Sequence, residues 1–340
     1  MAVRLKDVAE RAGVSVRTVS NVVNDFHYVA PQTRARVQAA VDELGYRPNT
    51  AARQLRGGRT GLVALVLPEL DSPYFSELGA LLTDEAERRG WTLLVEQTRG
   101  DSERELRLLQ ADRAHHVDGI VFSPWGVDPG ELDPAHHRVP LVVLGEQSPA
   151  GCFDHVGVDN IAAARSATEH LLGLGRRRIA TIGGQPHLAN ATAAQRIAGF
   201  RLAVEAAGLP ADSTFAADVR TLHREDGADA MRQLLDQSPD IDAVFCFTDE
   251  LALGAIRAAH ERGRRVPDDL AVVGFDDIED GRFSIPSLTT IAPDKTLIAT
   301  RAIELLQERL RDPSATARRE VAPYELVERE STRVSEHRRW

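Results

Sequence analysis

The sequence predicts two structurally different parts, a small all-α head and a much larger α/β body built on two doubly wound parallel sheets. Two observations predict this division. In the head, apolar side chains recur every three or four positions, which is the period of a helix. In the body, short apolar runs alternate with helical segments, which is typical of parallel strands buried on both faces. We place the head at 1–46, a linker at 47–59 and the body at 60–340.

Three helices are predicted for the head. The first has an apolar face at the spacing i, i+3, i+4 and i+7, formed by Leu5, Val8, Ala9 and Ala12. Gly13 permits a sharp turn, after which Ser15 can cap a second helix that runs to about Asn24. Pro31 suits the first position of a third helix, which Gly45 ends.

The body is predicted to consist of repeated strand–helix units. Its strand candidates are Gly61–Pro68, Trp91–Thr98, Gly119–Ser123, Pro140–Gly145, Arg178–Gly183, Ala243–Thr248, Leu270–Phe275 and the stretch from Tyr324. Helical segments between them include Ser76–Arg89, Ile161–Leu174, Ile197–Ala207 and Leu251–Arg262. About 270 residues are too many for one such sheet, so we expect two lobes with a cleft between them. The N-lobe is predicted at about 60–159 plus 293–321, and the C-lobe at about 160–292 plus 322–340.

Charge is divided unequally between the two parts. Residues 1–59 carry a net charge of +5 and the rest −15, within a total of −10. This distribution confines any phosphate-binding surface to the head, although +5 is too modest to decide the matter alone. No apolar run approaches the ~20 residues that cross a bilayer, and the charged start of the chain does not suit a secretory signal. We therefore expect a cytoplasmic protein with no membrane partner.

The segment from Lys6 to Asn24 carries the strongest functional signal. A helix, a glycine-bearing turn and a second helix form a helix-turn-helix, whose second helix enters the major groove of DNA by its N-terminus. The residues predicted to read base edges are Val16, Arg17 and Asn21. Those predicted to contact phosphates are Ser15, Thr18, Ser20 and Asn24. The alternative is an ordinary three-helix bundle with no nucleic-acid role.

At these residues the chain resembles the LacI family of bacterial regulators, and the resemblance covers nearly its whole length. Its other specific parts are Gly45-Tyr-Arg-Pro-Asn49 and Ala51-Ala-Arg-Gln-Leu55. The resemblance implies a hinge helix that forms on the operator and brings Ala52 and Leu55 to the minor groove, where Leu55 wedges a base step open. It also implies a phosphate contact from Tyr28. The alternative for Leu55 is a linker leucine that packs on the body, and Ala30 departs from the frequent serine cap of the family.

The body resembles the effector domain of that family, which is similar to periplasmic sugar-binding proteins. The resemblance implies a ligand cleft lined by Tyr74, Phe75, Trp125, Asn190, Thr192, Arg196, Thr248, Asp249 and Asp276, with Asp159 and Glu146 as weaker candidates. Arg196 and Asp276 are predicted to hold hydroxyl groups from two sides, and their alternative is an inter-lobe salt bridge. Trp125 either stacks on a sugar ring or caps a loop. Leu222 stands where the family often has an aromatic residue, which leaves ring stacking open.

Enzymatic chemistry is not predicted. Gly183-Gly184 follows a strand but lacks the Lys-Ser/Thr of a phosphate loop, and no G-x-G-x-x-G opens a helix. His115-His116 and His136-His137 are adjacent pairs, and Cys152 and Cys246 lack metal-ligand spacing, so neither a cofactor nor a metal is expected. The predicted partners are palindromic operator DNA, a sugar or sugar derivative, and a second copy of the chain. Nucleobase or nucleoside effectors, a soluble sugar-binding protein and a sugar-processing enzyme are the alternatives.

Overall fold

The computed structural model describes residues 3–23, 26, 28–46, 59–109, 117–128, 132, 139–145, 153–188, 191–210 and 214–333. The chain divides into two compact units, Met1–Thr60 and Gly61–Trp340. Among the described residues, no helix is long and apolar enough to cross a membrane.

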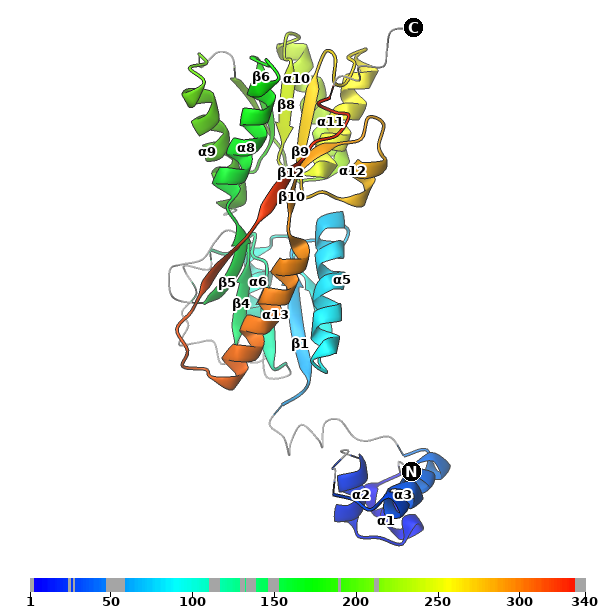
Figure 1. The fold of residues 1–340 in the computed structure, drawn as a ribbon. Helices are drawn as coiled ribbons and strands as arrows, with labels where there is room; N and C mark the ends of the chain where they lie inside the picture. The colour runs from blue at the N-terminus through cyan, green and yellow to red at the C-terminus, as the bar shows by residue number, and fades with distance from the viewer. Residues whose placement is uncertain are drawn as a thin grey trace. The chain divides into compact units, whose positions relative to one another are not determined.

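The first unit holds α1 (Leu5–Ala12), α2 (Val16–Val23) and α3 (Pro31–Leu44) (Figure 1). Val8, Val19 and Val37 are fully buried where these helices meet. Gly13 adopts a left-handed φ of 65° after α1, which turns the chain sharply into α2. Ala30 precedes α3 and supplies no side-chain cap, as the sequence indicated.

The first sheet of the body has the strand order β11-β5-β4-β3-β1-β2, and the strand pairs are parallel. Its strands are β1 (Leu62–Leu67), β2 (Thr92–Gln97), β3 (Gly119–Phe122), β4 (Leu141–Leu144), β5 (Asp154–Val158) and β11 (Arg319–Ala322). The helices α5 (Pro73–Arg88) and α13 (Lys295–Arg311) pack on one face, and α6 (Ser102–Leu109) packs on the other.

The second sheet has the strand order β12-β10-β9-β8-β6-β7. Its strands are β6 (Ile179–Gly184), β7 (Thr214–Asp218), β8 (Ala243–Cys246), β9 (Ala271–Phe275), β10 (Thr289–Pro293) and β12 (Tyr324–Val327), the last of which is antiparallel to β10. One face carries α8 (Asn160–Gly173) and α9 (Ala191–Ala206), and the other carries α10 (Arg224–Gln237) and α11 (Asp249–Glu261). The short α12 (Glu279–Phe283) follows β9.

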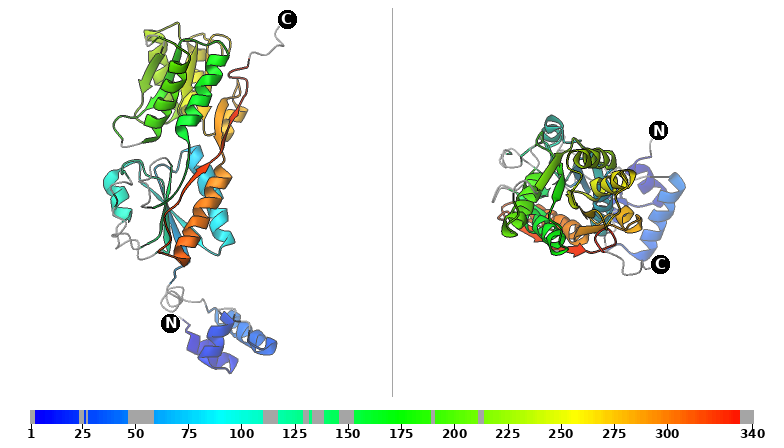
Figure 2. Two further views of the ribbon diagram at one scale, coloured as in Figure 1. Left: turned by 60° about the vertical axis from the view of Figure 1, so that its left-hand side comes forward. Right: turned by 90° about the horizontal axis from the view of Figure 1, so that it is seen from above.

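In its described part, the body passes between the two lobes three times: from β5 to α8, from β10 to α13 and from β11 to β12. The crossing segments lie side by side at the waist between the lobes (Figures 1 and 2). Such multiple crossings form a hinge that allows the lobes to move without unfolding either core. The predicted fold class, an all-α head and an α/β body with two mainly parallel sheets, is confirmed.

Candidate functional site

The first turn of α2 presents the side chains predicted to read DNA bases. Val16 is 41% exposed, and Arg17 is also exposed. Asn21 lies one turn further along the helix and is partly exposed, while Val19 and Val22 are buried on the opposite face. The helix therefore combines a buried apolar stripe with an accessible polar edge that starts at its N-terminus.

The hydroxyl groups beside this edge are organised by helix capping. Ser15 Oγ accepts a hydrogen bond of 3.1 Å from the Thr18 backbone N–H and lies 2.8 Å from Thr18 Oγ1. Tyr28 is 92% exposed, and its ring centroid lies 5.9 Å from that of Phe26. Ser20 is partly exposed. Among the other predicted DNA contacts, Asn24, Ala52 and Leu55 lie outside the described residues.

A cleft of about 940 Å³, open to solvent, lies between the lobes of the body. Seven residues predicted to bind ligand line it: Tyr74, Phe75, Trp125, Thr192, Arg196, Thr248 and Asp276. Most of them follow the carboxyl ends of parallel strands, where open α/β sheets bind ligands. Asn190 and Glu146 lie outside the described residues, and Asp159 caps α8 by accepting a hydrogen bond of 2.9 Å from Ala162 N–H.

The N-lobe side of the cleft is an aromatic wall. The ring of Phe75 lies 5.2 Å from that of Tyr74 and 5.9 Å from that of Trp125, and both pairs meet edge to face. Trp125 thus belongs to a continuous apolar surface, which suits the C–H face of a sugar ring.

The C-lobe side is polar, and Arg196 is fixed within it. The guanidinium donates from Nε to Asn160 Oδ1 at 2.7 Å and from Nη1 to the Phe247 carbonyl. It also lies 3.4 Å above the centre of the Phe275 ring, a cation–π contact. Arg196 is only 7% exposed, so its position is set before any ligand arrives.

Asp276 lies in a backbone conformation that is rare for a residue with a side chain. Its φ is 112°, and that of Asp277 is 51°. Such torsions store about 1–3 kcal/mol each and cluster at ligand sites. Lys295 Nζ donates to the carbonyls of Asp276 (2.9 Å) and Asp277 (3.2 Å), which holds this strained turn in place.

Comparisons with known proteins match both parts of the chain to known families. Residues 4–49 match the lacI family of bacterial regulatory proteins, and 168–332 match a periplasmic-binding-protein-like domain. The ribose operon repressor of Halalkalibacterium halodurans is 36% identical over 98% of both chains. The chain belongs to the LacI family. The lac repressor dimer bound to operator and the anti-inducer ONPF has a TM-score of 0.86 at 30% identity, over 98% of this chain and 99% of that one. The complex of the regulator CelR with cellobiose has a TM-score of 0.72 at 34% identity, over 97% and 99%.

For this LacI-family chain, the structure corrects one predicted ligand residue. Asp249 is fully buried and is not among the described residues that line the cleft. Its carboxylate accepts hydrogen bonds from Thr290 Oγ1 (2.6 Å) and from the Ile278 backbone N–H (2.9 Å). Burial raises its pKa well above the usual value, and the nearby Asp276 adds to this effect. Asp249 therefore does not face the cleft; it holds the turn that carries Asp276 by its hydrogen bond with Ile278.

The alternative proposed for Arg196 and Asp276, an inter-lobe salt bridge, is wrong. Arg196 is on α9 and Asp276 follows β9, so both belong to the C-lobe of this LacI-family regulator. An ion pair between them cannot join the two lobes. Leu222 also lines the cleft, in the region where the family often has an aromatic residue.

Sequence reasoning missed Glu105, which positions one wall of the cleft in this regulator. Its buried carboxylate accepts hydrogen bonds from the backbone N–H groups of Trp125 (3.1 Å), Gly126 (3.0 Å) and Val127 (2.8 Å). Burial raises the pKa of Glu105, while these bonds act in the opposite direction. An acidic residue on an amphipathic helix usually faces solvent, so nothing in the sequence pattern marked it.

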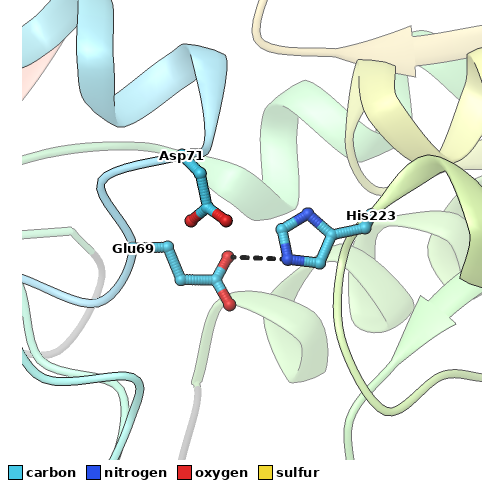
Figure 3. A group of neighbouring side chains, drawn as sticks. All are labelled: Glu69, Asp71 and His223. Atoms are coloured by element: carbon cyan, nitrogen blue, oxygen red, sulfur yellow. Dashed lines mark ion pairs between the residues drawn. The ribbon is translucent and has the colours of Figure 1, made fainter.

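Sequence reasoning also missed two acidic residues of the cleft. Glu69 and Glu250 line it from the N-lobe and the C-lobe respectively. Glu69, Asp71 and His223 bring metal-ligating atoms within 4.8 Å of one another. Figure 3 shows the three side chains next to one another. With Asp276, the acidic side chains in the lining outnumber Arg196, which disfavours an anionic ligand.

Proposed function

We propose that this LacI-family chain is a transcriptional repressor that binds a palindromic operator as a homodimer and releases it when a sugar binds in the cleft. The observation that carries the proposal is the cleft itself, in which an aromatic wall faces a fixed arginine and a strained aspartate. Aromatic faces and charged hydrogen-bonding groups together recognise the apolar and hydroxylated sides of a sugar. The relatives named after ribose and cellobiose support this class of effector.

Operator recognition is assigned to α2 in this proposal. Val16, Arg17 and Asn21 read bases, and Ser15, Thr18, Ser20 and Tyr28 contact phosphates. Asn24 and the hinge residues Ala52 and Leu55 keep their predicted roles. Because operator DNA is in the cytoplasm, the protein acts there, and it acts by binding rather than by catalysis.

The dimer is assigned to an apolar surface on the C-lobe. Phe283, the last residue of α12, is 79% exposed, and Ile285, two positions further along the chain, is 94% exposed. Two large apolar side chains exposed close together suit an interface between subunits. A dimer presents two heads to two half-sites, which a palindrome requires.

Operator recognition is tested by selecting binders of the full chain from a pool of randomised palindromic duplexes, followed by fluorescence titration. The wild-type chain should prefer one palindrome over random duplex. Arg17→Ala and Asn21→Ala should reduce that preference at single base positions by about 1–3 kcal/mol each. Arg257→Ala, on a surface helix of the body, is the control. Unchanged preference in both head variants would show that other residues read the operator.

The effector class is tested by a thermal-shift panel of ribose, glucose, cellobiose, hypoxanthine and adenosine. A sugar should raise the unfolding temperature by mass action and weaken operator binding. A nucleobase or nucleoside that raises the temperature while every sugar fails would replace the sugar in this proposal. The lining favours the sugar because Leu222 provides no second ring against which a planar base could stack.

A further inference from the structure

Glu69, Asp71 and His223 form a cluster whose members come from both lobes. Glu69 and Asp71 follow β1 in the N-lobe, and His223 directly precedes α10 in the C-lobe. Figure 3 shows the two carboxylates and the imidazole ring pointing toward one another. The Glu69 side chain is only 12% exposed, whereas that of His223 is 35% exposed. Glu69 also lines the cleft, and the cluster is open to solvent on the side of His223.

The separation between Glu69 and His223 fits two ligands of a shared ion better than it fits a hydrogen bond, and the Asp71 carboxylate lies within 4.8 Å of both. Glu69 Oε2 lies 3.7 Å from His223 Nε2, which is too long for a hydrogen bond. A zinc ion with bonds of about 2.0–2.2 Å to nitrogen and oxygen holds neighbouring ligand atoms roughly 3–4 Å apart. Imidazole nitrogen and carboxylate oxygen are donors that zinc accepts.

A fourth residue, Glu250, gives an independent indication from the other side of the imidazole. It is 8% exposed, and its Oε2 lies 3.9 Å from His223 Nδ1. Its contact with Arg224 Nε is also 3.9 Å long, so neither ion pair is a hydrogen bond. A histidine that binds a metal through one nitrogen usually donates the other N–H to a carboxylate, and Glu250 lies on the Nδ1 side of the ring, at 3.9 Å and so beyond hydrogen-bond distance in this structure.

The electrostatic environment favours an added cation. Burial raises the pKa of Glu69 and of Glu250, and Asp71 raises both further because it carries the same charge. His223 and Arg99 oppose this effect at Glu69, and Arg224 and His223 oppose it at Glu250. Acidic groups are thus crowded and partly desolvated here, and a divalent ion would relieve their repulsion.

We propose that Glu69, Asp71 and His223 bind one divalent transition-metal ion, zinc by the chemistry of the donors, and that Glu250 orients the imidazole. Three protein ligands leave the fourth tetrahedral position open to water or to a hydroxyl group in the cleft. Because the ligands come from both lobes, the ion fixes the distance between them and gives the regulator an input separate from the sugar. Sequence spacing does not reveal the site, since His223 is far along the chain from the two acids.

The test is isothermal titration of the full, untagged, EDTA-treated chain with ZnCl₂. We expect saturable binding of one ion per chain and a rise in unfolding temperature with metal concentration. Glu69→Gln and His223→Gln should each weaken binding by about tenfold or more. The controls make the same chemical changes at exposed positions, Glu103→Gln and His260→Gln, and should bind zinc as the wild type does.

Three outcomes would overturn the site: no saturable binding up to millimolar zinc, equal affinity in His223→Gln, or equal loss in the two control variants. Urea unfolding without metal verifies that the variants are folded, so a loss of zinc binding is not a loss of structure. Glu250→Gln should retain the stoichiometry with weaker binding. The zinc titration uses neither DNA nor sugar, so a negative result does not contradict the proposed function. Negative results in the operator and sugar assays likewise do not contradict the metal site.

Discussion

The two walls of the cleft carry different kinds of side chain, although both come from six-stranded sheets with a similar strand order. The N-lobe contributes Tyr74, Phe75 and Trp125, whose rings contact one another. The C-lobe contributes Arg196 and Asp276, each held by hydrogen bonds to its surroundings. Apolar contact is tolerant of ligand orientation, whereas fixed hydrogen-bonding groups are not. We infer that the N-lobe supplies affinity for sugar rings in general and the C-lobe supplies discrimination between them.

The largest effect is expected from Arg196→Ala. Its removal takes a buried cation from the cleft and leaves Asn160 Oδ1 and the Phe247 carbonyl without their donors. Titration with the sugar that gives the largest thermal shift should show at least about a hundredfold weaker binding, or ~2.7 kcal/mol. Operator binding without sugar should remain, as it should in the exposed control Arg257→Ala. Normal sugar binding by Arg196→Ala would show that the C-lobe does not discriminate between sugars through Arg196.

Trp125→Ala should have an intermediate effect of a different kind. Loss of the ring opens the aromatic wall beside Phe75 but removes no hydrogen bond made by the backbone of Trp125. The affinity for every sugar that binds should fall about tenfold, or ~1.4 kcal/mol, and the order of the sugars by affinity should stay the same. Titrations with a set of epimeric sugars measure this ranking. A changed ranking would mean that the aromatic wall also discriminates.

Glu105→Gln should produce a smaller loss through the same wall. Glutamine has one oxygen, so its amide group meets backbone N–H donors that the carboxylate oxygens accept in the wild type. A buried donor left unpaired costs about 1–3 kcal/mol of folding stability. Sugar affinity should fall severalfold because Trp125 loses its support, and faster hydrogen exchange at Gly126 and Val127 would localise the effect. Unchanged exchange there would show that Glu105 does not position the loop.

The sequence predicted most strands through their apolar runs and missed four strands that carry polar residues, β5, β7, β10 and β11; in β10 these are Thr289 and Thr290. Each of the eight predicted stretches contains a strand, because runs such as Leu141–Leu144 are uniformly apolar. β5 (Asp154–Val158) was missed because it contains Asp154 and His155, whose burial depends on tertiary contacts such as the ion pair of Asp154 with Arg309. β7 and β11 were missed because edge strands carry polar and exposed residues.

Lining residues of the cleft could be predicted where they follow a predicted strand. They could not be predicted where tertiary packing decides whether a side chain is buried or faces the cleft. Tyr74, Thr248 and Asp276 were located by their position after strands. Asp249 also follows a strand, but the first turn of its helix faces the core and buries it. Glu69 and His223 come together only because two lobes meet, which no spacing in a single sequence encodes.

The smallest effect concerns the turn that shapes the C-lobe wall, and it depends on pH. Burial alone would raise the pKa of Asp277, but hydrogen-bonded ion pairs with Arg329 (2.6 Å) and Arg282 (2.7 Å) outweigh it and lower the pKa below the usual 3.8. A carboxylate with a lowered folded-state pKa contributes stability above its unfolded-state pKa and loses it as pH falls through the folded-state value. Asp277→Asn should therefore reduce the free energy of unfolding at pH 7 and flatten its decline below about pH 4. Urea unfolding at pH 7 and at about pH 3 measures the difference, with the exposed Asp229→Asn as the control. The same pH dependence in wild type and Asp277→Asn would mean that the ion pairs of Asp277 do not stabilise the C-lobe turn.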